Sequence, residues 1–128
     1  IAGVIVHDLG KLQEMERNEL GLVTDYTVQG RLVGHIVSGA INIERVGQKL
    51  GISENTIMLM QHMVLSHHGE PEFGSALRPL IPEAEVLSTI DRLDARMFEM
   101  FEALRDVPVG GFSARVWALE NRELYKAR

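Results

Sequence analysis

The sequence predicts an all-α fold, a bundle of helices in one domain, 1–128. Two observations favour that class. Apolar residues recur three and four positions apart over long stretches, which is the period of an amphipathic helix. These stretches are bounded by residues that start or stop helices, such as Thr27, Ser53 and Pro82. With 128 residues, of which 45% are hydrophobic, the chain is long enough to bury a core.

The first element is an apolar run at the start of the chain. Residues 1–8 have the character of the last turns of a buried helix, which we expect to close near Gly10 in a left-handed C-cap. Because the run has neither an initiator methionine nor a capping residue, we expect an N-terminally truncated fragment. Residues 11–27 are polar and poorly periodic, which predicts a surface loop with a short strand pair at residues 22–26.

Two helices are predicted in the middle of the chain. Thr27 is a favourable N-cap for a helix that runs to about Leu50, where Gly51 ends it. Ser53 begins the next helix, which continues to Gly69. The apolar stripe of the first of these helices comprises Leu32, Ile36, Ala40, Ile43 and Val46 or Gly47.

The last third of the chain is predicted to hold one long helix. Residues 70–81 form a loop with two prolines and a glycine, and Pro82 suits the first turn of a helix over about 83–105. Residues 107–111 break this helix, and a short amphipathic piece follows at 116–124. The stripe of the long helix comprises Val86, Ile90, Leu93, Met97, Met100 or Phe101, and Leu104.

Composition excludes several classes of function. The chain has no cysteine, so a disulfide framework, a thiolate metal site and a cysteine nucleophile are excluded. A net charge of −5 argues against a nucleic-acid binder that acts alone, because such domains carry a basic surface. No apolar run approaches the length of a membrane span. A cysteine-free acidic chain fits the cytoplasm.

Histidines and aspartates fall at four points of the helical pattern. Imidazole and carboxylate groups together suit Mn, Fe, Ni or Zn. Helical bundles build metal sites from side chains on facing helices. The set therefore predicts a divalent cation centre and metal-assisted phosphoester chemistry. Its members are His7 and Asp8, followed by Gly10 and Lys11, then His35, the tandem His67 and His68, and Asp91.

Each member of this set also has a structural explanation. Asp8 can be a solvated helix-end residue beside a partly buried His7. His35 can be a hydrogen-bonded residue of the core. His67 and His68 would interact favourably with the dipole at a helix C-terminus. Each of these explanations accounts for one residue alone. The presence of all these residues in one chain favours the metal centre.

Asp91 requires a partner if it is buried. It lies within the apolar stripe of the long helix, where an unpaired carboxylate costs several kcal/mol. A salt bridge with Arg92 or Arg96 would satisfy it as well as a cation would, and Asp94 competes with it for the same role. His62, which diverges from His67 on their helix, is assigned a structural role.

The set resembles the HD superfamily of metal-dependent phosphohydrolases. Members carry a histidine, a His-Asp pair and a late aspartate, with further histidines between them in two-metal members. Residues 7–11 match the HDxGK form of the doublet, and His35 with the tandem histidines matches the intermediate positions. Residues 90–93 match the late-aspartate segment, which favours Asp91 over Asp94. The resemblance implies an HD-domain helical bundle.

Longer segments are similar to one subgroup, the YhaM-type bacterial 3′→5′ exoribonucleases. The similarity covers residues 24–35, 65–75, 90–97 and 118–126, so it spans nearly the whole chain. It implies hydrolysis of nucleotides from the 3′ end of single-stranded RNA. The first histidine of the family and its OB-fold domain, a fold that binds single strands, would lie upstream in the parent protein.

The resemblance also implies a ligand role for each metal residue. Asp8 would bridge two divalent ions, with Mn²⁺ as the first choice and Fe, Ni or Zn as alternatives. His7 and Asp91 would bind one ion together with the upstream histidine. His35 and His67 would hold the second ion.

Three further residues are assigned to substrate and catalysis by the same resemblance. Lys11 would bind a phosphate oxygen, and His68 would protonate a leaving group or support the ligand shell. Arg78 would contact the nucleic-acid backbone, unless it is a plain surface arginine. Two other functions stay open: a phosphohydrolase of small nucleotides, and a non-catalytic interaction domain with a relic metal site. The oligomeric state, including a homo-oligomer, also stays open.

Overall fold

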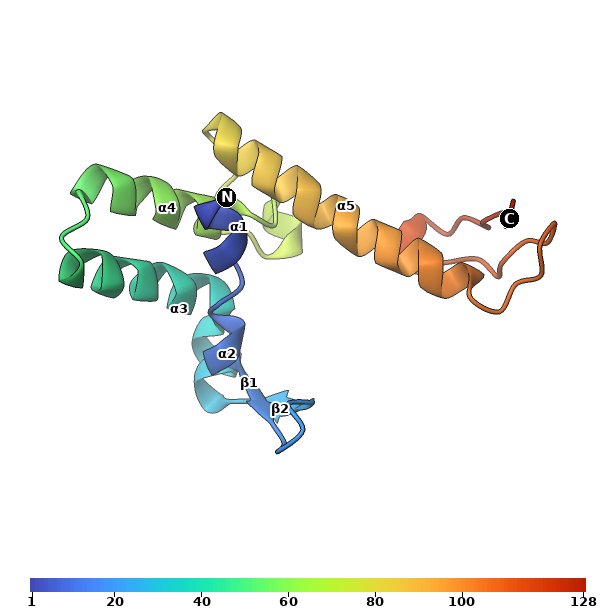
Figure 1. Cartoon of the computed structure of the whole chain (residues 1–128), viewed down its shortest axis with the longest axis horizontal. Coiled ribbons are helices and arrows are strands. Elements are labelled where there is room, and N and C mark those ends of the chain that lie inside the picture. Colours follow the sequence, from blue (N-terminus) through green and yellow to red (C-terminus); the bar gives the residue numbers. More distant parts are fainter. The chain divides into compact units, whose positions relative to one another are not determined.

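The structure, a computed structural model, describes residues 1–128, apart from the side chain of Phe73, and consists mainly of helices (Figure 1). The predicted all-α class is confirmed. The chain divides into two compact units, Ile1–Thr89 and Ile90–Arg128. Among the described residues, no helix combines the length and the apolar character that crossing a membrane requires.

The first unit begins with two short helices, α1 (Ala2–Val6) and α2 (Lys11–Glu14). The left-handed C-cap predicted at Gly10 is wrong, because this residue has a right-handed φ of −59° and leads directly into α2. The glycine is required for another reason. A Cβ atom at this position would lie 2.0 Å from the carbonyl oxygen of His35, so only a glycine allows the two backbones to approach.

The surface loop predicted over residues 11–27 is wrong for most of its length. Besides α2, it contains the strands β1 (Met15–Arg17) and β2 (Val23–Tyr26), which pair antiparallel with Met15 opposite Tyr26. The strand pair expected near the end of this segment is therefore present. All four residues of β2 are exposed, so the alternation of apolar and polar residues that signals a half-buried strand is missing.

The two central helices lie side by side and are joined by a short loop (Figure 1). They are α3 (Val28–Lys49) and α4 (Glu54–Ser66), close to their predicted bounds. The hydroxyl groups of Thr27 and Ser53 accept hydrogen bonds from backbone N–H groups of the first turns, at 2.8 and 3.3 Å. Gly51 has a φ of +67°, which suits the end of α3. Both predicted N-caps are confirmed.

A kink at Gly34 divides α3 into two parts that run in different directions (Figure 1). Gly34 has φ 74° and ψ 166°, a conformation that is essentially restricted to glycine. The kink explains why the predicted stripe holds only after it. Ile36 and Ala40 are buried, whereas Leu32, which precedes the kink, is 80% exposed.

The core of the first unit contains buried residues of α3, of α4 and of the start of α5 (Pro82–Leu104). Ala84 and Leu87 supply the buried residues of α5. The stripe predicted for this helix is wrong as a buried face, since Ile90 and Leu93 are both more than half exposed. The loop at 70–81 is largely irregular, as predicted, and contains one short 3₁₀ turn, η1 (Pro71–Phe73).

The second unit combines the remainder of α5 with the C-terminal segment. Two antiparallel bridges, Phe112 to Tyr125 and Val116 to Arg122, fold this segment back on itself. The predicted amphipathic piece contains the 3₁₀ turn η2 (Trp117–Leu119). Within this unit Leu119 and Leu124 are buried, and Arg96 binds both carboxylate oxygens of Glu120 at 2.6 and 3.0 Å.

Candidate metal centre

Asp8 lies at the centre of a group of histidines. It follows α1, in the turn that leads into α2. Its Oδ2 atom accepts a hydrogen bond from Lys11 Nζ at 2.6 Å. Its Oδ1 atom lies 3.6 Å from His35 Nε2 and 3.7 Å from His67 Nε2. The Asp8 carboxylate therefore faces the Lys11 ammonium group with one oxygen and two imidazole nitrogens with the other.

The charge of Asp8 is stabilised by its neighbours. Partial burial acts to raise the pKa of this carboxyl group, but the hydrogen bond and charge of Lys11, helped by His7 and His67, outweigh it. The pKa of Asp8 is therefore lower than its usual value. Asp8 is an anion at neutral pH, which is the state that a metal ligand requires.

His67 is held in the tautomer that can bind a metal. It follows the last residue of α4 and is 1% exposed. Its Nδ1 atom donates to the carbonyl oxygen of Val64 at 2.6 Å. Because a carbonyl only accepts, Nε2 must carry the lone pair. Burial lowers the pKa of His67 to about 4, so the ring is neutral at physiological pH.

His7 is held in the same way at the end of α1. Its Nδ1 atom donates to the carbonyl oxygen of Val4 at 2.8 Å, so in the neutral ring the lone pair is on Nε2. Nε2 lies 3.5 Å from Asp8 Oδ2. The His7 and His67 rings meet edge to face, with centroids 5.1 Å apart.

His35 reaches the same place because of the kink in α3. It is the first residue after Gly34, and both its backbone N–H and its Nδ1 atom lie 3.1 Å from Glu14 Oε1. Glu14, at 9% exposure, was missed as a site residue. The segment around it lacks the periodicity that would have marked it as buried, so the sequence gives no direct signal for its role.

Three buried atoms of this group have no hydrogen-bond partner among the residues that the structure describes. They are Asp8 Oδ1, His35 Nε2 and His67 Nε2. An unsatisfied buried polar atom costs about 1–3 kcal/mol, and native structures contain few of them. Here all three point toward one another, and each can donate a lone pair. A divalent cation is the partner that fits all three.

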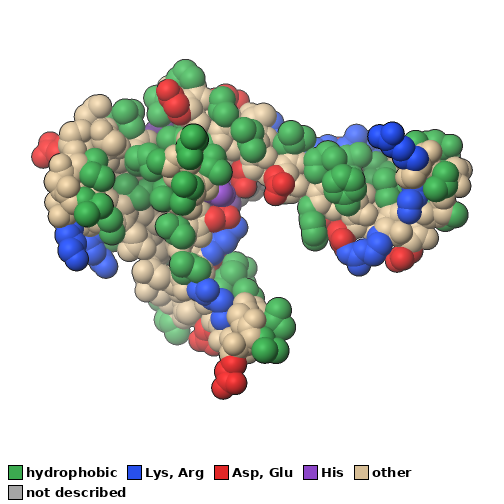
Figure 2. Space-filling model, in the orientation of Figure 1, with side chains coloured by type: hydrophobic (Ala, Val, Ile, Leu, Met, Phe, Trp, Pro, Cys, Tyr) green, Lys and Arg blue, Asp and Glu red, His purple; other side chains and the backbone are tan. Residues whose placement is uncertain are grey.

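His68 extends this ligand set. One nitrogen from each of His35, His67 and His68 can be chosen so that all three lie within 4.8 Å of one another. The His68 ring lies 4.3 Å from that of His67 and 5.3 Å from that of His35, measured between centroids. Figure 2 shows a small patch of histidine on the face in view, beside acidic and basic side chains.

Three further residues were given roles from the sequence. Asp91 is a half-buried residue of α5 in the second unit and stays a predicted ligand. Arg78 is in the loop at 70–81, where it forms an exposed ion pair with Glu70 at 2.7 Å. His62 accepts a hydrogen bond from the backbone N–H of Leu80 at 2.9 Å, which agrees with the structural role predicted for it.

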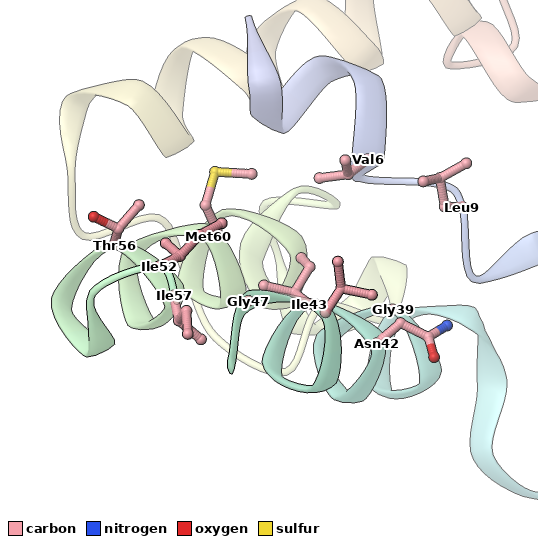
Figure 3. Close-up of a pocket in the computed structure, with 11 residues that line it drawn as sticks. Val6, Leu9, Gly39, Asn42, Ile43, Gly47, Ile52, Thr56, Ile57 and Met60 are labelled. Carbon is pink, nitrogen blue, oxygen red and sulfur yellow. The ribbon is translucent and has the colours of Figure 1, made fainter. Parts of the chain in front are cut away.

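A cavity of about 230 Å³ lies between α3, α4 and the end of α1 with the turn after it (Figure 3). Its lining is apolar except for Asn42 and Thr56, and none of the described residues that line it is a histidine or a carboxylate. Val6 and Leu9 point into it, whereas His7 and Asp8 between them belong to the metal centre. The cavity is therefore distinct from the candidate metal centre.

Comparison with known proteins identifies a matching family and similar sequences. The model of the HD domain family matches residues 1–96. The chain is 46% identical over 125 residues to the 3′-5′ exoribonuclease YhaM of Bacillus pumilus, and 48% identical over 126 residues to that of Geobacillus sp.. These alignments cover 98% of this chain but only 39% and 38% of the relatives. No solved structure gives a significant match.

Proposed function

This chain belongs to the HD domain family, and from that premise we propose that it forms the catalytic domain of a metal-dependent 3′→5′ exoribonuclease. The relatives named above support the reaction, because they match almost the whole chain. The convergence of Asp8 Oδ1, His35 Nε2 and His67 Nε2 on one point, without partners, is the single observation that carries the proposal.

We propose a centre for two divalent ions, with Mn²⁺ as the first choice. Asp8 would bridge them. His7 and Asp91 would serve one ion, and His35 and His67 the other, where the position of His68 supports it as a further ligand. When bound, such ions would activate a water molecule and stabilise the charge that develops on a phosphoryl group.

Lys11 and His68 would act on the substrate. The Lys11 ammonium group now interacts with Asp8, next to the histidines. A phosphate oxygen that enters the centre would bring a second anion within its reach, so Lys11 would bind and orient the phosphate. His68, unless it serves as a ligand, would hold the proton for the leaving oxygen.

Contacts with the RNA chain would come mostly from outside this domain. The net charge of −5 makes the chain a poor binder of phosphates without its metals. The chain spans about 39% of the length of the curated relatives it matches. We propose that a further domain of the parent protein, an OB-fold, holds single-stranded RNA, and that the enzyme acts in the cytoplasm. Arg78, exposed and paired with Glu70, is a secondary candidate for a backbone contact.

The experiment compares the full-length parent protein with an Asp8→Asn variant. With Mn²⁺ and a 5′-labelled oligoribonucleotide, we expect the wild-type protein to shorten the RNA stepwise from the 3′ end. Asp8→Asn should abolish both shortening and tight Mn²⁺ binding, the latter measured by calorimetry. Asp25→Asn is the matched control. Asp25 is an exposed carboxylate of the hairpin, and it interacts with Arg31 of α3 at 2.7 Å.

Two outcomes would overturn the proposal. Hydrolysis of mononucleotides without any action on RNA would identify a small-nucleotide phosphohydrolase instead. A wild-type protein that binds no divalent metal, with an Asp8→Asn variant that behaves identically, would indicate an interaction domain with a relic site.

A further inference from the structure

We infer that Glu14 is a positioning residue of the metal centre, because its buried carboxylate fixes the tautomer and the orientation of His35. The inference rests on the proposed function in one respect only, namely that a metal binds at His35 Nε2. The inference goes beyond the proposed function because it assigns a role to a glutamate outside the HDxGK motif. Glu14 lies at the end of α2, and its backbone leads into β1.

The first argument is the geometry of the contact. His35 Nδ1 lies 3.1 Å from Oε1 and 3.1 Å from Oε2 of Glu14. A carboxylate only accepts hydrogen bonds, so Nδ1 carries a proton, and in the neutral ring the lone pair is then on Nε2. This nitrogen is the one that faces Asp8 Oδ1 at 3.6 Å. Without such a partner, a neutral histidine is free to carry its proton on Nε2, where it would block a metal.

The second argument is that the kink frees the backbone N–H group of His35 to bind Glu14. In a regular helix the N–H of His35 would bind the carbonyl of Arg31. The non-helical conformation of Gly34 releases it, and it donates to Glu14 Oε1 at 3.1 Å instead. The carboxylate therefore caps the second part of α3 and orients the first side chain of that part with the same oxygen.

The third argument is that Glu14 is itself held rigidly. Its carbonyl oxygen accepts hydrogen bonds from the backbone N–H and the hydroxyl of Thr27, at 2.9 and 3.3 Å. Gly30 allows the two backbones to approach, since a Cβ atom there would lie 2.2 Å from the Glu14 carbonyl oxygen. With Gly10 packed against His35 in the same way, α2 is fixed against α3 at both ends.

These contacts explain why the position holds a glutamate. A carboxylate that accepts from the outer nitrogen of a ligating histidine sets the ring orientation and raises its basicity. Loss of such a partner typically lowers metal affinity about 10- to 100-fold. Glutamine is the sharpest substitution, because it has the same shape but its amide group can donate to His35 Nδ1 and so favour the wrong tautomer.

The experiment combines NMR of the metal-free protein with Mn²⁺ titration. Long-range ¹H–¹⁵N spectra of the wild-type protein, in a chelating buffer at neutral pH, should show His35 protonated on Nδ1. Glu14→Gln should move a measurable fraction of His35 to the Nε2–H tautomer and weaken Mn²⁺ binding about 10- to 100-fold. The matched control is Glu16→Gln, which changes an exposed glutamate of the neighbouring strand and should alter neither readout.

The outcomes separate this inference from the proposed function. Nε2 protonation of His35 in the wild-type protein would overturn the inference even if the variant failed to fold. The inference also fails if Glu14→Gln lowers only the unfolding free energy and leaves the tautomer and the Mn²⁺ affinity unchanged. If the wild-type protein bound no Mn²⁺ but the variant switched the tautomer, the proposed function would fail while the role of Glu14 in orienting His35 would stand.

Discussion

Residues 6–9 serve two regions of opposite character. Val6 and Leu9 line the apolar cavity, whereas His7 and Asp8 between them belong to the metal centre. The cavity offers empty volume and almost no polar atoms (Figure 3). The centre is marked instead by three buried atoms that lack a partner among the described residues. In this molecule the candidate centre is identified by its unsatisfied ligand atoms.

The two regions also differ in what their glycines contact. In the metal centre, a side chain on Gly10 would collide with the backbone of His35, which cannot move without moving α3. At the cavity, a side chain on Gly47 would meet the side chain of Ile57, at 2.6 Å. Ile57 also lines the cavity, so we expect its side chain to turn into that space. The centre is therefore rigid where the cavity is adaptable.

Alanine substitutions at Gly10 and Gly47 should give the largest difference in unfolding free energy between the two regions. Gly10→Ala should lower the unfolding free energy by about 3 kcal/mol or more, because the backbones of α2 and α3 must separate. It should also weaken Mn²⁺ binding, since His35 would be displaced. Gly47→Ala should change stability by less than about 1 kcal/mol, because the gain in helix propensity offsets the crowding. Urea denaturation and calorimetry measure both. Equal losses of stability in the two variants would contradict this difference between the regions.

A second prediction concerns pH, to which the metal centre should respond and the apolar cavity should not. The pKa of His67 is about 4 in the folded protein and about 6.5 when the chain is unfolded. Between these values the unfolded state binds more protons, so the unfolding free energy rises with pH through this window and levels off above it. The difference is about 3 kcal/mol at most.

The measurement is chemical denaturation of the metal-free protein in chelating buffer from pH 4 to 7. His67→Asn is the control variant, because an asparagine amide can still donate to the carbonyl of Val64. It should flatten most of the slope. A slope that persists unchanged in this variant would show that other groups cause it.

The smallest effect is expected at the cavity itself. Val46 lines the cavity and is half exposed, so Val46→Leu adds one methylene group to existing space. Stability should change by about 0.5 kcal/mol or less. Mn²⁺ affinity should be unchanged, because no ligand contacts this wall. A loss of metal binding in this variant would mean that the two regions are coupled through residues 6–9.

The sequence predicts most of the helical architecture because its signals are local. The hydroxyl caps at Thr27 and Ser53 and the proline at position 82 mark helix starts that the structure reproduces. The kink at Gly34 could not be predicted, since its conformation depends on α2 packing against α3. The helix α2 and the strand β1 were not predicted, because they are only four and three residues long and their segment has no clear period.

The candidate site could likewise be predicted only in part. Residue types and the HDxGK doublet indicated five histidine and aspartate side chains that the structure brings together in the first unit: His7, Asp8, His35, His67 and His68. Glu14 could not be found in this way. Its burial results from contacts with residues at positions 27–35, and nothing in its own neighbourhood signals them.

The broken geometry of α3 has a consequence for amide hydrogen exchange. A continuous helix frays from its ends, so its central amides are the slowest to exchange with solvent. In α3 the ladder of backbone bonds restarts at His35, which places a fraying end in the interior of the helix. Protection should therefore form two separate blocks, and the segment before Gly34 should open without unfolding the remainder.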